Sequence, residues 1–228
     1  MEKLTAKKAY ELLVEGVIEE LADLQKSENK WILHCIFTGL AAERIAAKLN
    51  LDSDYAKALG FVHDIGRKIS HPKHTIEGYN YMLEKGYVEE AKICLTHSFI
   101  DNDIMMTAGG GPNKQYTYEY INNFLIQTPV NIYDNIVQMA DLFCLETGFT
   151  TIENRLLDIS KRKGIYPNSL DHVNKTMELK DRLELMMGCD LYSLFPEIKR
   201  EDLDKIETDH EELMELVKHP NKQLIRQS

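Results

Sequence analysis

The sequence contains few cysteines and no long apolar run. Its four cysteines lie far apart and include no C-x-x-C pair, which favours reduced thiols in a cytosol over a zinc knuckle or a disulfide framework. No uncharged apolar stretch approaches the roughly 20 residues that a membrane-spanning helix needs. Residues 1–13 carry a charge every few positions and lack the apolar core of a secretory signal. We therefore expect a cytoplasmic protein that does not bind membranes.

Basic residues are also scarce. The chain has 27 Lys and Arg residues against 37 Asp and Glu residues, which gives a formal net charge of −10. Proteins that grip a polynucleotide nonspecifically need a basic stripe to face its phosphates. The charge balance therefore argues against a polynucleotide partner, whereas a small nucleotide stays open as a substrate.

Strand patterns are absent as well. No β-alternation rises above noise, and apolar residues recur at helical spacing along most of the chain. The length of 228 residues suits one domain, 1–228, with a sizeable core. We predict an all-α fold with helices at about 5–25, 29–49, 55–64, 74–86, 88–99, 115–127, 131–148, 169–187 and 201–217.

Several polar residues fall close to predicted helix ends. His34 lies in the first turns of its helix. His63 and Asp64 lie at the carboxyl end of the next one, where Gly66 supplies the flexible backbone that ends a helix. The connection over about 98–114 is glycine-rich and long, which predicts a loop over a pocket. Helix ends from distant segments could thus converge on one site.

Asp141 has the most informative surroundings. It lies in a predicted helix among apolar residues, where an ionised carboxylate is costly to bury unless a metal, a cation or several donors compensate. A structural hydrogen bond would also satisfy it, and each histidine taken singly suits a surface or a core position. Together, His34, His63, Asp64 and Asp141 form a set of imidazoles and carboxylates that suits a divalent metal such as iron, manganese or zinc.

This pattern resembles the HD superfamily of metal-dependent phosphohydrolases, which has a His, a His-Asp pair about thirty residues later and a distant Asp. The run HDIGR is also similar to the HDIGK run of the HD-GYP and related two-metal branches, with Arg67 in the place of lysine. The resemblance covers roughly 30–146. It implies an HD-domain helical bundle with additional C-terminal helices, the core and the extension lying at about 28–148 and 149–217.

The two-metal branches have two further histidines, the first often four residues before a glycine. The run HTIEG places His74 and Gly78 in that relation, and His97 matches the second histidine. His71 is an alternative to His74 as a ligand. The resemblance implies one ion held by His34, His63 and Asp141, another held by His74 and His97, and Asp64 bridging both.

The segment after His97 reads SFIDND and lacks the His-His-Glu and Gly-Tyr-Pro run of cyclic-dinucleotide phosphodiesterases. The layout is more similar to bacterial HD hydrolases that act on symmetrical dinucleoside polyphosphates. The resemblance therefore implies that a metal-activated hydroxide cleaves a phosphate ester or anhydride of a small nucleotide-like substrate. Two divalent ions are expected, iron or manganese, with zinc, magnesium, cobalt and nickel open. Asp64 and Arg67 would be catalytic, and the expected substrate contacts are Arg67, Lys68, Lys73, Asp101 and Lys114.

Two other functions stay open. The same ligand set occurs in an oxygenase branch resembling inositol oxygenase, which holds a mixed-valent diiron centre and acts on a small organic substrate. A nucleotide-sensing module without turnover is the other, although the complete ligand set argues against it. Arg67 and Lys68 beside the HD pair suit a phosphate, which favours hydrolysis. The charged helices after about 150 leave a homodimer open.

Overall fold

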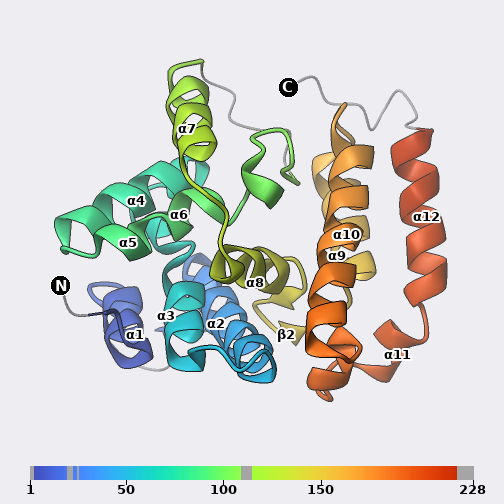
Figure 1. The fold of residues 1–228 in the computed structure, drawn as a ribbon, viewed down its shortest axis with the longest axis horizontal. Helices are drawn as coiled ribbons and strands as arrows, with labels where there is room; N and C mark the ends of the chain where they lie inside the picture. The colour runs from blue at the N-terminus through green and yellow to red at the C-terminus, as the bar shows by residue number, and fades with distance from the viewer. Residues whose placement is uncertain (1–2, 20–22, 25, 109–114, 220–228) are drawn as a thin grey trace. The chain divides into compact units, whose positions relative to one another are not determined.

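A computed structural model describes residues 3–19, 23, 24, 26–108 and 115–219. The described residues are almost entirely helical or in short turns, which confirms the predicted all-α class (Figure 1). They form two compact units, one from Met1–His97 with Asn131–Gly148 and the other from Ser98–Val130 with Phe149–Ser228. Among the described helices, none is long and apolar enough to span a membrane.

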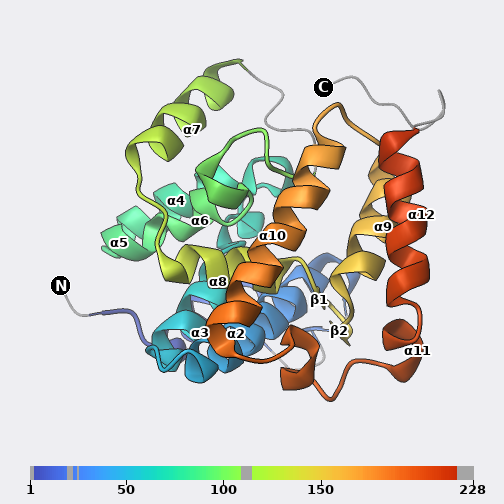
Figure 2. The same ribbon diagram turned by 45° about the vertical axis from the view of Figure 1, so that its right-hand side comes forward.

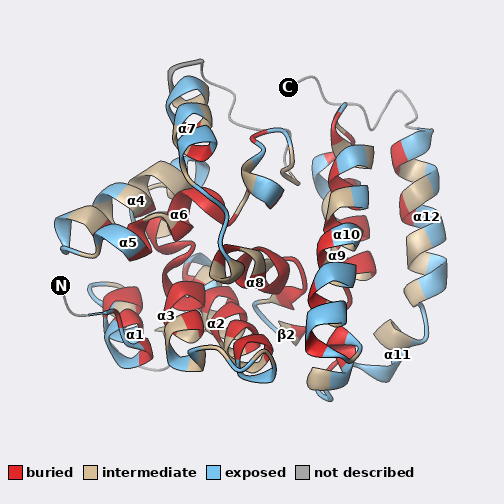
Figure 3. Cartoon of the chain, in the orientation of Figure 1, coloured by how far each residue is buried: buried red, intermediate tan, exposed pale blue. Residues whose placement is uncertain are grey.

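The first unit is built around α2 and α3. Helix α2 packs against α3 and α8 (Figures 1 and 2), and α1 packs against α3 (Figure 1). Helix α8 is largely buried, and none of its residues is exposed (Figure 3). The elements of the unit are α1 (Ala6–Val14), η2 (Ser27–Asn29), α2 (Lys30–Lys48), α3 (Ser53–Val62), η3 (Ile65–Lys68), η4 (His71–Lys73), α4 (His74–Glu84), α5 (Val88–Ala91), α6 (Ile93–Thr96), α8 (Ile132–Asp141) and β1 (Cys144–Leu145).

Two glycines allow α2 and α3 to cross so closely that their backbone atoms are in contact. A Cβ atom placed on Gly60 would lie 2.5 Å from the Cα of Gly39 and 2.7 Å from its nitrogen. Such distances leave no room for even a methyl group. His34 lies on α2 five residues before Gly39, and His63 lies three residues after Gly60. The close crossing therefore holds these two histidines near each other.

The first predicted helix is wrong in length. Helix α1 ends at Val14, and Gly16 follows with a φ of 72°, a left-handed conformation that glycine adopts readily. The ammonium group of Lys68 donates to the carbonyl oxygens of Leu12 and Glu15, the latter at 2.8 Å, and so caps the end of α1. Residues 20–22 and 25 of the expected helix lie outside the described residues.

Other predicted helices agree more closely with the structure. The helices expected at 29–49, 115–127 and 169–187 are confirmed as α2, α7 and α10. The helix expected at 88–99 is broken into α5 and α6, and that expected at 201–217 is broken into α11 and α12. Part of the expected loop over 98–114 forms the short η5 turn, and its residues 109–114 lie outside the described residues.

In the second unit, α9 and α12 pack side by side, and α10 also contacts α12 (Figures 1 and 2). Buried Glu153 on α9 accepts a hydrogen bond from the hydroxyl of Tyr192 at 2.7 Å, which satisfies both polar groups. The remaining elements are η5 (Ile100–Asn102), α7 (Gln115–Gln127), β2 (Gly148–Phe149), α9 (Ile152–Lys163), α10 (Ser169–Met187), η6 (Leu191–Leu194), α11 (Arg200–Leu203) and α12 (Ile206–Lys218).

Candidate metal centre

The structure brings the six predicted ligand residues together within the first unit. They come from five segments, and most of them stand at helix ends, where short turns can aim side chains inward. The positions are His34 in the second turn of α2, His63 and Asp64 directly after α3, His74 at the start of α4, His97 directly after α6, and Asp141 at the end of α8.

His34, His63 and Asp141 form the first half of the cluster. The Nε2 atom of His34 lies 2.8 Å from Oδ1 of Asp141 and 3.3 Å from Nε2 of His63. Nε2 of His63 lies 3.6 Å from the same carboxylate oxygen. One nitrogen from each ring and one oxygen thus face a common point, as ligands of a single ion would.

Asp64, His74 and His97 form the second half. Oδ1 of Asp64 lies 3.2 Å from Nε2 of His74 and 3.5 Å from Nε2 of His97. Oδ2 of the same carboxylate lies 3.8 Å from Nε2 of His63. The two oxygens of Asp64 therefore face the two halves of the cluster.

All four imidazoles are oriented by the same device, a hydrogen bond between Nδ1 and a backbone carbonyl oxygen. A carbonyl oxygen only accepts, so each Nδ1 carries the hydrogen, and each Nε2 presents a lone pair to the cluster unless it too is protonated. Metal-bound histidines usually donate from the ring nitrogen that does not bind the metal, which fixes the orientation of the ring. The pairs are His34 with Cys144 at 3.1 Å, His63 with Gly60 at 2.7 Å, His74 with His71 at 2.9 Å and His97 with Ile93 at 3.0 Å.

The electrostatics of the cluster fit a divalent cation. Burial alone would raise the pKa of the Asp64 carboxyl, but His74, His63, His97 and the Arg67 guanidinium together hold that pKa well below its usual range. Desolvation lowers the pKa of His74 to about 4. At neutral pH, Asp64 is therefore ionised and His74 is neutral, which are the protonation states that metal binding requires.

The Asp64 carboxylate also carries an unsatisfied atom. Its side chain is only 2% exposed, yet Oδ1 has no hydrogen-bond partner among the described residues. An ionised oxygen buried without a donor is costly, and a cation beside it removes that cost. The residues present thus fit one or two divalent ions. Their nitrogen and oxygen atoms are ligands of such ions, their side chains face common points, and Oδ1 of Asp64 still needs a positive partner.

Gly66 places His74 in the second half of the cluster. A Cβ atom on Gly66 would lie 2.9 Å from the Cα of Gly78 and closer still to the His74 carbonyl oxygen, so α4 rests directly on the turn that follows Asp64. The sequence interpretation of Gly66 as a flexible helix end is wrong, because its φ is not positive. Gly66 is required because it has no side chain, which allows the backbone of α4 to pack against this turn.

Replacement of Gly66 by alanine is expected to destabilise the fold by about 3 kcal/mol and to displace His74, because rigid backbone atoms must move. Chemical denaturation and metal titration would measure both effects. Gly86→Ala is the matched control, since a Cβ there meets nothing within 4 Å and only its φ of 88° is strained. It should cost about 1 kcal/mol and leave metal binding unchanged. Equal effects of the two variants would contradict this role of Gly66.

Solvent reaches the cluster at one set of side chains. Asp141 is 26% exposed, His74 22% and Arg67 30%, whereas His63 and His97 are essentially buried. A ligand that approaches from solvent would therefore meet the cluster at Asp141, His74 and Arg67.

Among the predicted substrate contacts that the structure describes, Arg67 lies at the cluster, whereas Lys68, Lys73 and Asp101 make other contacts or are exposed. Arg67 donates from Nε to Oδ2 of Asp64 and so lies at the cluster. The Lys68 ammonium group instead caps α1, and Lys73 is exposed on η4. Asp101 belongs to the second unit, where it pairs with Arg182 at 2.8 Å. Lys114 lies outside the described residues.

Sequence reasoning missed a polar stripe on α8 that supports the site. Gln138 donates to the Thr96 carbonyl oxygen at 2.9 Å, and the Thr96 hydroxyl donates to Asp134 at 2.8 Å. These buried contacts hold the end of α6, where His97 follows Thr96. The signal was the spacing of Asp134, Gln138 and Asp141, which places three polar residues on one face of an apolar helix.

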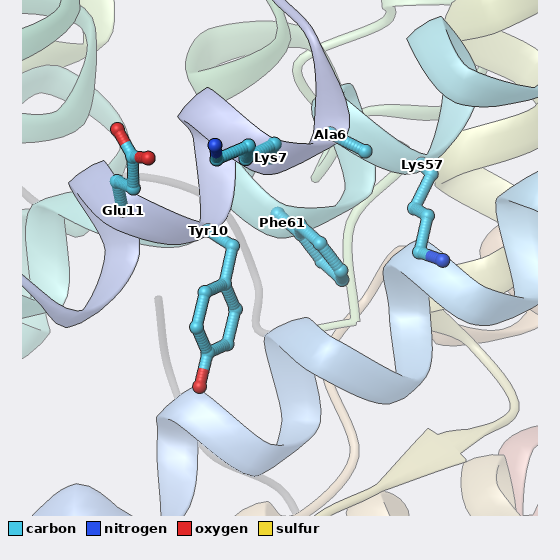
Figure 4. A pocket seen from close by; sticks show the side chains of 6 residues that line it. All are labelled: Ala6, Lys7, Tyr10, Glu11, Lys57 and Phe61. Carbon is cyan, nitrogen blue, oxygen red and sulfur yellow. The ribbon is translucent and has the colours of Figure 1, made fainter.

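A groove elsewhere in the first unit lacks this chemistry. It has a volume of about 460 Å³ and lies between α1 and α3 (Figure 4). Its one carboxylate belongs to exposed Glu11, and its Lys57 is paired with Glu43 at 3.0 Å. The groove therefore offers no ligand set comparable to the cluster.

Comparison with known proteins gives one match. The HD domain family model matches residues 31–144, a span that includes all six cluster residues. No curated protein and no solved structure matches the chain. HD domains bind divalent metal ions and are generally metal-dependent phosphohydrolases. The match covers half of the 228 residues and coincides with the cluster, and the chain therefore belongs to the HD domain family.

Proposed function

We propose that this protein hydrolyses a phosphate ester or anhydride of a small nucleotide-like substrate with two divalent ions. One observation carries the proposal: the Nε2 atoms of four imidazoles and the oxygens of two carboxylates gather in two adjacent groups, with Asp64 close to histidines of both. His34, His63 and Asp141 would hold one ion, and His74 and His97 the other. Asp64 would contribute one oxygen to each.

Bound ions would lower the pKa of a coordinated water and neutralise charge on a phosphoryl group. The protein's own residues would hold the ligand side chains in fixed orientations around these ions. The hydrogen bonds at Nδ1 fix the imidazoles before any ligand arrives, so little reorganisation is needed. Buried His63 and His97 exclude water from the inner side, and the exposed edges of Asp141 and His74 leave the outer side open to substrate.

Arg67 supports a phosphate-bearing substrate. Its guanidinium lies at the open edge of the cluster, and its Nε–H is used by Asp64. Planar guanidinium groups bind phosphate oxygens through several N–H donors. The net charge of −10 argues against long nucleic acids, so a mononucleotide or a dinucleoside polyphosphate is the preferred class. The test is phosphate or nucleotide release from a panel of both classes with Mn²⁺ or Fe²⁺; no release from any member would contradict the proposal.

An oxygenase with two irons is the second candidate. The same ligands suit iron, and the placement of Lys68 at α1 removes one of the two cations that favoured a phosphate. Oxygen uptake with a small organic substrate, together with a mixed-valent iron spectrum and no phosphate release, would establish this function instead.

His74→Ala is expected to remove one of the two ions, whereas His71→Ala should remove neither. His74 faces Asp64 at 3.2 Å, while exposed His71 turns its Nδ1 toward Arg67 at 3.3 Å. Metal analysis of the two purified variants measures the difference. Loss of an ion from His71→Ala but not from His74→Ala would move the second site to His71.

A further inference from the structure

The Asp64 carboxylate is asymmetric. Oδ2 accepts a hydrogen bond from Nε of Arg67, while Oδ1 has no hydrogen-bond partner among the described residues and faces His74 and His97. A carboxylate can rotate about its last bond, so the atom that binds Oδ2 also determines where Oδ1 points. The direction of Oδ1 therefore depends on Arg67.

Arg67 is itself held in place. Its backbone N–H donates to the Asp64 carbonyl oxygen at 2.9 Å, which closes the turn between the two residues. At the far end of the side chain, Nη1 lies 3.3 Å from Nδ1 of His71. The turn alone brings the Nε–H to the carboxylate, and the contact with exposed His71 adds to it, so the hydrogen bond to Oδ2 does not require His71.

We propose that Arg67 is a positioning residue that fixes the rotation of the Asp64 carboxylate and so presents Oδ1 to the ion held with His74 and His97. This inference rests on the proposed two-ion centre. It adds to Arg67 a role distinct from phosphate contact, because its Nε–H is directed at Oδ2 of Asp64. Each carboxylate oxygen has two lone pairs, so Oδ2 can accept from Arg67 and still face the first ion.

Lysine should not replace Arg67 in this role. The Nε atom of arginine follows Cδ directly, whereas the ammonium nitrogen of lysine lies one bond farther along the side chain. Lysine also has no planar fork that can reach Asp64 and His71 at once. Charge would be retained but the orientation of Asp64 would be lost.

The experiment is a titration of the chelator-treated full chain with Mn²⁺ alone, which counts the ions and gives a dissociation constant for each. The wild type is compared with Arg67→Gln, Arg67→Lys and the control Lys48→Gln, which removes an exposed cation from the last turn of α2. Circular dichroism shows whether each variant is folded. The wild type and the control should bind two ions. Both Arg67 variants should bind the first ion normally and the second at least about tenfold more weakly.

The outcomes separate the two proposals. A wild type that binds two ions and an Arg67→Gln variant that binds both equally well would overturn the role of Arg67 and leave the two-ion centre standing. A wild type that binds a single ion would overturn the two-ion centre and, with it, this inference. If Arg67→Gln does not fold, Arg67→Lys decides, because wild-type binding of the second ion by that variant overturns the orientation role.

Discussion

Replacement of Asp64 by asparagine is expected to abolish binding of both ions and to lower turnover on the order of a thousandfold or more, about 4 kcal/mol. The amide has nearly the same shape but no charge, and only one of its two atoms can bind a metal. Oδ1 and Oδ2 of Asp64 face different halves of the cluster, so a single substitution affects both. Metal analysis and steady-state kinetics measure the two losses.

Glu90→Gln is the matched control for Asp64→Asn. Glu90 is a buried acid of the same unit, and its carboxylate accepts a hydrogen bond from the Leu4 backbone at 3.3 Å, away from the cluster. Its amide variant should keep both ions and full turnover, even if it is less stable. An Asp64→Asn variant with two ions and normal turnover would rule out the bridging role.

Asp141→Ala is expected to lose the first ion and to lower turnover by at least about a hundredfold, because only two neutral imidazoles and the shared Asp64 carboxylate would remain to hold that ion. Desolvation would raise the pKa of Asp141, but His34 and His63 hold it well below its usual range, so its charge is present at neutral pH. Loss of metal and loss of hydrolysis should occur together. Metal content and turnover measured on the same preparation test this.

The control for Asp141→Ala lies on the same helix. Asp134 is a buried carboxylate seven residues earlier, and it is bound by the Thr96 hydroxyl instead of facing the two halves of the cluster. Asparagine keeps an oxygen that can accept from the Thr96 hydroxyl, so Asp134→Asn should leave His97 in place and both ions bound, with lower stability from the weakened contact with the Asn131 backbone N–H. Full metal content and full turnover in Asp141→Ala would exclude Asp141 as a ligand.

The helical fold could be predicted from sequence because helices leave a local periodic pattern. The cluster residues could be predicted because the chain resembles the HD superfamily, and that resemblance alone indicated His74 and His97. Helical periodicity gave α2, α7 and α10 with nearly correct bounds. The cost of burying Asp141 among apolar residues, and its spacing from His34 and the His63–Asp64 pair, selected residues that the structure brings together.

The remaining features depend on contacts between distant segments, which single-sequence patterns do not encode. Gly66 looked like a helix end, but it provides the space into which the backbone of α4 packs. Lys68 was expected to contact phosphate because it follows the HD pair. Its ammonium group instead donates to the carbonyl oxygen of Glu15 at the end of α1, 53 residues earlier in the sequence. The partnership of Gln138 with Thr96 likewise spans 42 residues. Each of these becomes visible only when helices are packed together.

The most direct test of the two-ion phosphohydrolase is the metal content of anaerobically purified protein, measured together with phosphate or nucleotide release from mononucleotides and dinucleoside polyphosphates. Two ions per chain with hydrolysis that ceases after chelation and returns with Mn²⁺ is the predicted result. Two irons per chain with no hydrolysis of any member of the panel would contradict the phosphohydrolase and would favour the diiron oxygenase.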